Sequence, residues 1–132
     1  MKKKGFTLIE LMVVILIVGI LAAASIPLMR GRIESAKWSE ANAMAGTIRS
    51  AAKVYFAENG SIDNNVTMSE LGFTTGDLDG TYFSEDCFSV TGSDEYGNVA
   101  VTVDATKSDK AKAPTSGTYV LSLTGEWGES SD

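Results

Sequence analysis

The side chains on which most enzymes and metal sites depend are scarce in this sequence. The 132 residues include no histidine, so the commonest general base and a frequent zinc ligand are absent. Cys87 is the only cysteine, which excludes a disulfide within the chain. The sequence contains carboxylates, but it has neither a glycine-rich phosphate loop nor a nucleophile signature. We therefore predict a protein that is not an enzyme, with no catalytic residue, metal ligand or cofactor.

One carboxylate lies where a charge is costly. Glu10 stands at the start of an apolar run whose uncharged residues extend over positions 11–29. A helix of that length spans roughly 29 Å, about the hydrocarbon thickness of a bilayer. An acid at membrane depth costs roughly 2.5–3.5 kcal/mol on insertion scales. We therefore expect Glu10 to have a function.

The charges that flank the apolar run indicate its orientation. Lys2, Lys3 and Lys4 precede the run, and Arg30 and Arg32 follow it. The basic start favours an N-terminus in the cytoplasm and a polar bulk outside it. The run is longer than that of an ordinary secretory signal, so an uncleaved membrane anchor is the general alternative.

The junction between the basic and apolar residues carries a specific pattern, Lys-Gly-Phe-Thr-Leu-Ile-Glu over positions 4–10. It closely resembles the prepilin-type leader of type IV pilins and type II secretion pseudopilins. The resemblance is strong over residues 4–29 and looser to about residue 60. It implies that a prepilin peptidase cuts between Gly5 and Phe6 and that Phe6 is then N-methylated.

The resemblance also implies roles for residues inside the apolar run. Cleavage would leave an ammonium on Phe6, and we expect Glu10 to form an assembly charge pair with it, preferably between subunits. The alternative is that Glu10 only reaches the lipid headgroups. Gly19 and Pro27 match positions where the long helix of the family bends or melts, because both residues weaken helices.

A helical pattern continues beyond residue 29. Apolar residues recur there at steps of three and four, as on one face of a 3.6-residue helix. They are Ala41, Met44, Ala45, Ile48, Ala51, Ala52, Tyr55 and Phe56. The Asn59-Gly60 pair is typical of a helix end. We predict one helix over about residues 6–58, whose second half packs on a head.

The remaining residues predict a small sheet. Residues 60–80 are expected to form a long loop with a short helical turn at 68–71. Three antiparallel strands are expected over 82–90, 99–104 and 118–124, with turns at 93–98 and 106–117 and with Trp127 capping the last strand. The predicted fold class is α+β: a long N-terminal helix, membrane-spanning in its first half, packed on a small antiparallel β-sheet head.

The resemblance and these patterns together imply four segments. Residues 1–5 would be the cleaved leader, residues 6–29 the hydrophobic transmembrane and assembly helix, and residues 30–59 the amphipathic second half of that helix. Residues 60–132 form the globular head.

Two charged features of the head allow other interpretations. Residues 54–106 contain ten acids and no base, which is typical of a solvated exterior. Some pseudopilins bind calcium, but residues 77–80 lack the ligand spacing of a calcium loop. Lys107, Lys110 and Lys112 could contact DNA in an uptake pilus, yet their cluster is short and lacks aromatic residues, which favours a solvated loop.

Cys87 departs from the related pattern. Many type IVa pilins close a C-terminal loop with a disulfide, and a lone cysteine cannot do so. We expect Cys87 to be a small buried side chain in a strand, with an intersubunit disulfide or lipid attachment as the alternatives.

The resemblance implies a structural subunit of a type IV pilus or pilus-like filament, a helical homo-oligomer. Its partners would be the prepilin peptidase and the assembly machinery. The subunit would cross the inner membrane once, N-in, before assembly and lie in an extracellular pilus or periplasmic pseudopilus afterwards. The alternative is a minor pilin or pseudopilin that serves as a tip or binding module in secretion or DNA uptake. The sequence leaves motility, adhesion, DNA uptake and secretion open.

Overall fold

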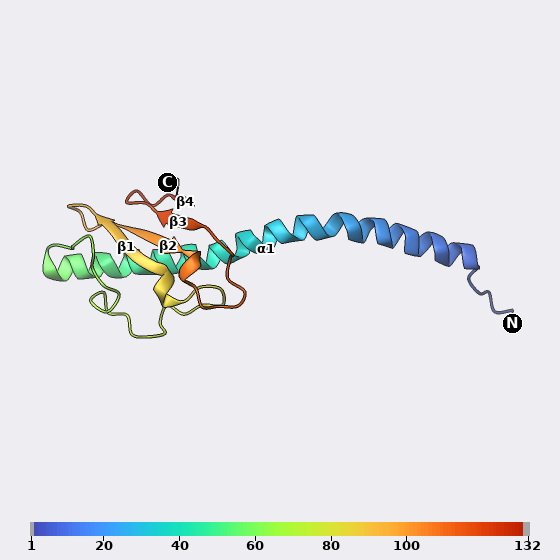
Figure 1. The fold of residues 1–132 in the computed structure, drawn as a ribbon, viewed down its shortest axis with the longest axis horizontal. Helices are drawn as coiled ribbons and strands as arrows, with labels where there is room; N and C mark the ends of the chain where they lie inside the picture. Colours follow the sequence, from blue (N-terminus) through green and yellow to red (C-terminus); the bar gives the residue numbers. More distant parts are fainter. Residues whose placement is uncertain (1, 131–132) are drawn as a thin grey trace. The chain divides into compact units, whose positions relative to one another are not determined.

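The computed structural model describes residues 2–130, which divide into two compact units at the Ser35–Ala36 bond. One continuous helix, α1 (Leu8–Asn59), contains that boundary (Figure 1). The second unit adds four strands: β1 (Phe88–Ser93), β2 (Val99–Asp104), β3 (Thr118–Leu121) and β4 (Trp127–Glu129). The predicted α+β class, a long N-terminal helix packed on a small antiparallel sheet, is confirmed.

The part of α1 in the first unit is exposed on all sides. Its large apolar side chains at positions 8–29 keep between 49% of their surface exposed at Val13 and 77% at Leu8. By length and composition, this stretch of α1 is sufficient to cross a membrane. A helix that is apolar all round requires lipid or other protein to cover it.

The part of α1 in the second unit buries one face. Its buried residues follow the predicted three-and-four spacing and are Trp38, Ala41, Ala45, Ile48 and Ala52. The alanines let the helix backbone approach the sheet closely, where β2 contributes Val99, Val101 and Val103, all fully buried. The predicted amphipathic face is therefore confirmed, with Trp38 added at its N-terminal end.

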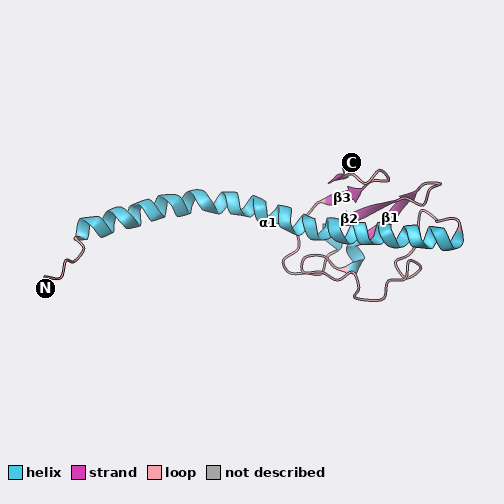
Figure 2. Ribbon diagram, turned by 180° about the vertical axis from the view of Figure 1, so that it is seen from behind, coloured by secondary structure: helices cyan, strands magenta, loops and turns pink. Residues whose placement is uncertain are grey.

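The sheet is an antiparallel meander in the order β1-β2-β3-β4. Val90 pairs with Val101, Val101 with Leu121, and Leu121 with Trp127, so these side chains share the face that meets α1. Figures 1 and 2 both show the strands beside the C-terminal half of α1. Burying one face of a helix against one face of a sheet gives this small head its core.

The predicted strand over residues 82–90 is wrong in its first part. β1 begins at Phe88, and Glu85–Cys87 form a 3-10 turn, η1. The backbone before this turn bonds to a side chain instead of a strand, because the Glu40 carboxylate accepts the N–H groups of residues 81–83. Cys87 accordingly lies in the turn and not in a strand.

The predicted end of the sheet is also wrong. β3 stops at Leu121, a tight turn follows, and Trp127 belongs to a fourth strand instead of capping the third. Ser122 donates its backbone N–H to the Glu126 carbonyl across this turn, 2.8 Å away. A strand of three residues is too short for its alternation to stand out in a sequence.

The loops follow the prediction more closely. Residues 61–80 contain no regular helix or strand, and hydrogen-bonded turns occupy residues 68–72. The β1–β2 turn contains Gly97 at φ +76°, packed against the Phe56 ring, where a Cβ atom would overlap the ring. Helix α1 begins at Leu8 and ends at Asn59, close to the predicted limits.

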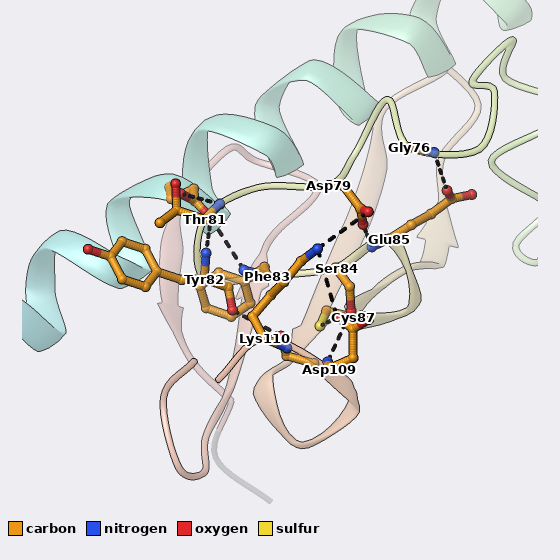
Figure 3. A network of polar contacts seen from close by, with 12 residues as sticks. Gly76, Asp79, Thr81, Tyr82, Phe83, Ser84, Glu85, Cys87, Asp109 and Lys110 are labelled. Carbon is orange, nitrogen blue, oxygen red and sulfur yellow. Dashed lines mark hydrogen bonds and ion pairs between the residues drawn. The ribbon is translucent and has the colours of Figure 1, made fainter. Parts of the chain in front are cut away.

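Two polar side chains of α1 attach the head to the helix. Glu40 accepts backbone N–H groups from Thr81 at 3.1 Å, Tyr82 at 2.8 Å and Phe83 at 3.3 Å (Figure 3). On a later turn of the helix, Arg49 donates to the carbonyl of Leu123 and to the side chain of Asn98. These bonds hold three loops of the head to a single helix.

Candidate functional site

The bond proposed for cleavage lies outside the helix. Residues 2–7 have no regular secondary structure, and α1 starts two residues after Phe6. Gly5 and Phe6 are exposed, and 84% of the Phe6 surface is accessible. Proteases act most readily on exposed and non-helical backbone. The conformation of this segment is therefore suitable for a peptidase.

Glu10 is held at the start of α1 by a reciprocal pair of hydrogen bonds. Its carboxylate accepts the backbone N–H of Thr7 at 2.9 Å, and the Thr7 hydroxyl accepts the backbone N–H of Glu10 at 3.3 Å. This arrangement is a capping box, which satisfies two of the four N–H groups that a helix start leaves without a partner. The carboxylate consequently points back toward the N-terminus.

Sequence reasoning missed the role of Thr7, although its signal was present. Threonine followed three residues later by glutamate, immediately before an apolar run, is the pattern of a capping box. The same pattern recurs at Thr67 and Glu70 in the head, where both reciprocal bonds also form.

The structure brings Phe6 and Glu10 to one place. Both line a shallow, mostly apolar hollow of about 580 Å³ on the surface of the first unit, together with Ile9 and Val13. A new amino group on Phe6 would lie one residue before the N–H that the Glu10 carboxylate already accepts. The site can thus place an anion beside a cation within an apolar surface.

Gly19 and Pro27 both lie within α1 and are exposed. A Cβ atom built at Gly19 would meet no atom within 4 Å, so the glycine is not needed for packing in the single chain. Pro27 lacks the N–H that would bond to the Ala23 carbonyl four residues earlier. Both positions are helical in the single chain.

Cys87 is a free thiol with 1% of its surface exposed, as expected for a small buried side chain. Its sulfur lies 3.8 Å from the Ser84 hydroxyl, shown in Figure 3. Burial separates Cys87 from solvent.

Three of the charged candidates of the head, Asp77, Asp79 and Lys110, are engaged in loop contacts, whereas Lys107 and Lys112 are exposed. Asp79 accepts the backbone N–H of Glu85 at 3.1 Å and forms an ion pair with Lys110 at 3.4 Å (Figure 3). Asp77 accepts both the backbone N–H and the hydroxyl of Thr74. Within residues 2–130, no three acidic, cysteine or histidine side chains form a group that could hold a metal ion.

Local hydrogen bonds keep several head carboxylates ionised. The backbone N–H and hydroxyl of Thr67 lower the pKa of Glu70, and the same groups of Thr74 lower the pKa of Asp77. The side chain of Asn98 is the main cause of a lowered pKa at Asp94. The Asp104 pKa is lowered mainly by the hydroxyl of Thr106. These four carboxylates therefore keep their negative charge into mildly acidic solution.

Comparison with known proteins gives independent evidence on the N-terminal segment. Residues 1–26 match the family model of the prokaryotic N-terminal methylation motif. A type IV major pilin protein, PilE1 of Neisseria gonorrhoeae, is 41% identical over 83 residues, which are 63% of this chain and 50% of that protein. A fimbrial protein of Neisseria meningitidis is 42% identical over 80 residues, covering 61% of this chain and 46% of the relative.

A third relative is the fimbrial protein EcpC of Eikenella corrodens, 45% identical over 58 residues, which cover 44% of this chain and 38% of that protein. The chain thus spans about half the length, or less, of the curated relatives it matches. The N-terminal part of this chain is therefore similar to that of type IV major pilins and fimbrial proteins, and its helix-on-sheet fold agrees with that similarity.

Proposed function

We propose that this chain is a structural subunit of a type IV pilus or pilus-like filament. The observation that carries the proposal is the exposed apolar stretch of α1, which begins with a capped carboxylate inside a matched methylation motif. The relatives are named as major pilins and fimbrial proteins, which favours a filament subunit over a tip-binding protein. The same relatives favour a role without catalysis.

The precursor spans the inner membrane once, with the leader of residues 1–5 in the cytoplasm. The transmembrane and assembly segment is residues 6–29, the amphipathic half of the helix is residues 30–59, and the head is residues 60–132. A prepilin peptidase cuts after Gly5, Phe6 is methylated, and the assembly machinery moves the subunit into a filament outside the inner membrane. Two features of the chain support these steps. The first part of α1 is exposed on all sides, and a basic, non-helical segment precedes it.

Assembly exchanges one apolar environment for another. Lipid covers residues 11–29 before assembly, and the same segment of neighbouring subunits covers it afterwards. Little hydrophobic free energy is gained by this exchange, because lipid tails are as apolar as leucine. Close packing at small residues such as Gly19 and the alanines at 22–24, together with specific charge pairing, then directs the assembly.

Glu10 supplies that charge pairing. In the single chain its carboxylate bonds to its own backbone at Thr7, 2.9 Å away. In the filament it pairs with the Phe6 ammonium of a neighbour, which neutralises two charges that enter an apolar bundle. A buried charge left without its partner costs roughly 3–5 kcal/mol, enough to reject a misplaced subunit.

Residues 19–27 open on assembly. An interior proline costs about 3 kcal/mol or more in a helix, and glycine is roughly 1 kcal/mol worse than alanine. The helix between Gly19 and Pro27 is therefore the weakest part of α1, and neighbouring helices can satisfy its freed backbone groups. An electron-microscopy map of the filament should show a loss of helix there, and a straight, continuous helix would contradict this part of the proposal.

The decisive experiment is Glu10→Ala, compared with Glu34→Ala as a matched loss of one acid from the same helix. Both proteins are expressed in a pilus-forming bacterium that lacks its own major pilin. Mass spectrometry should show loss of residues 1–5 from both. We expect sheared filaments to fall at least about a hundredfold for Glu10→Ala and to persist for Glu34→Ala. Abundant filaments from processed Glu10→Ala protein would exclude the charge pair as the basis of assembly.

A further inference from the structure

A cleft lies between the last turns of α1 and the loop that follows it. One part has a volume of about 390 Å³ and is lined by polar groups that include Asp63 and Glu70. The adjoining part, about 310 Å³, is more apolar and is lined by Val54, Leu71 and neighbouring residues. Tyr55 lines both parts, and we name the whole the Tyr55 cleft.

The Tyr55 cleft combines an apolar floor with a negative rim. Val54 keeps 59% of its surface exposed although it is aliphatic. Glu58, Asp63 and Glu70 supply three carboxylates, and no lysine or arginine among the described residues 2–130 lines the cleft. The last turn of α1 also contains no basic residue, so no cationic side chain of that turn offsets the partial negative charge of the helix end.

The Glu70 carboxylate is fixed in place. It accepts the backbone N–H of Thr67 at 2.8 Å and the hydroxyl of Thr67 at 2.7 Å. These bonds also lower the pKa of Glu70, so it stays ionised. A preorganised carboxylate loses little side-chain entropy when a cation binds to it.

The complementary features occur in residues 30–33, which we name the basic segment. Arg30 and Arg32 are exposed and form no ion pair within the described residues 2–130. Ile33 lies beside them and keeps 47% of its surface exposed. Two guanidinium groups with an adjacent aliphatic side chain match a cleft with an apolar floor and acidic rim, because guanidinium binds carboxylates through paired hydrogen bonds.

We propose that the basic segment of one subunit docks in the Tyr55 cleft of a second copy of this chain. Arg30 and Arg32 pair with the cleft carboxylates, and Ile33 covers Val54. The two surfaces belong to one continuous helix and lie some 25 residues apart along it. In a filament of parallel subunits, they would therefore meet between copies that are staggered along the filament. The inference rests on the proposed filament and adds a second, polar contact to it.

The first test is charge reversal followed by rescue. Arg30→Glu with Arg32→Glu should reduce sheared filaments at least about tenfold while leaving removal of residues 1–5 unchanged. Adding Glu58→Arg and Asp63→Arg should restore at least half of the wild-type yield. Lys107→Glu with Lys112→Glu is the matched control, since it makes the same charge change at exposed head positions and should leave the yield within about twofold.

The second test uses no charge-reversed variant, so it does not require the subunit to fold and assemble with reversed charges. Filaments of Arg32→Lys protein are treated with a carbodiimide, which joins amines to carboxylates that touch. Peptide mass spectrometry of filaments mixed from isotopically light and heavy subunits should find position 32 of one copy joined to Glu58, Asp63 or Glu70 of another. Arg32→Gln filaments are the control, because their side chain at that position carries no amine.

The outcomes separate the inference from the proposed function. Absence of filaments from the wild-type chain would refute the proposed function. Wild-type filaments with no cross-link to the cleft would overturn the inference alone. Equal loss of filaments in the Lys107 and Lys112 control would also overturn it, since a general charge effect would then explain the result. Cross-links from position 32 to another protein of the machinery would assign the basic segment to that partner instead.

Discussion

The two halves of α1 have the same backbone conformation and opposite surroundings. Over residues 8–35 every side chain is exposed, whereas the stretch from Ala36 to Asn59 buries one face against its own sheet. Ile17 and Ile48 are the same residue type in the same helix, with 51% and 0% of their surface exposed. The comparison shows that helix formation is local, while burial depends on which molecule supplies the covering surface.

The two halves of α1 also differ in how far along the sequence the hydrogen-bond partners of their polar side chains lie. The exposed half carries Glu10, which bonds within its own first turn. The packed half carries Glu40 and Arg49, whose partners lie 41 to 43 and 49 to 74 residues away in sequence. The first half therefore makes its polar contacts within its own helix, whereas its apolar side chains still require lipid or another protein to cover them.

The largest expected effect concerns release of the exposed half from its leader. Gly5→Leu should abolish processing, because the peptidase that the resemblance implies accepts only a small residue before the cut. Mass spectrometry of membranes should find the full-length chain alone. Gly128→Leu places the same side chain at an open position of β4 and should leave cleavage unchanged. Efficient cleavage of the Gly5→Leu protein would refute the assigned site.

The next effect compares the two isoleucines directly. Ile48→Ala removes a fully buried side chain, and we expect the free energy of unfolding of the head to fall by about 2–5 kcal/mol. Ile17→Ala should change it by less than about 0.5 kcal/mol, because Ile17 keeps 51% of its surface exposed and lies outside the buried core of the head. Denaturant titration of the full chain in detergent micelles, followed by the fluorescence of Trp38 and Trp127, measures both. Equal losses would show that the halves are not independently stabilised.

A smaller effect is expected at the polar attachment between helix and loop. Glu40→Ala leaves the backbone N–H groups of residues 81–83 without their acceptor, and we expect a loss of about 1–3 kcal/mol. Glu95→Ala, at an exposed turn position, is the control. The same titration measures both variants, and an unchanged stability of the Glu40→Ala protein would show that water replaces the carboxylate without cost.

The smallest effect is a dependence of stability on pH in the packed unit. The pKa values of Asp94 and Asp104 are lower in the folded chain than their ordinary values, chiefly through bonds from Asn98 and Thr106. Such carboxylates stabilise the fold above the unfolded pKa, and this stabilisation is lost as the pH falls through the folded pKa. Thermal unfolding midpoints should therefore be flat near neutrality and fall below about pH 4.

Asp104→Asn should flatten that acid slope, because the amide cannot titrate and still accepts the bond from Thr106. Far-ultraviolet circular dichroism between pH 7 and pH 2.5 follows the transition. A slope that is unchanged in this variant would assign the acid sensitivity to other carboxylates.

Much of the molecule was predictable because its determinants are local. The apolar run over residues 11–29, the three-and-four spacing that includes Ala41 and Ile48, and the stop at Asn59-Gly60 act through the helix backbone itself. The candidate site was also predictable in outline, since Gly5, Phe6 and Glu10 lie within six residues. The capping role of Thr7 was readable from its spacing to Glu10 and was overlooked.

Only the tertiary structure decided where residues 82–87 and Trp127 belong. Residues 82–87 have strand-like composition, yet their backbone bonds to Glu40, some forty residues earlier, and turns into η1. Trp127 enters a fourth strand because β3 offers a free edge and the rings of Trp38 and Tyr119 lie against it, with centroids 6.5 Å and 5.4 Å away. These outcomes depend on groups far apart in sequence, whose attraction exists only once the chain has brought them together.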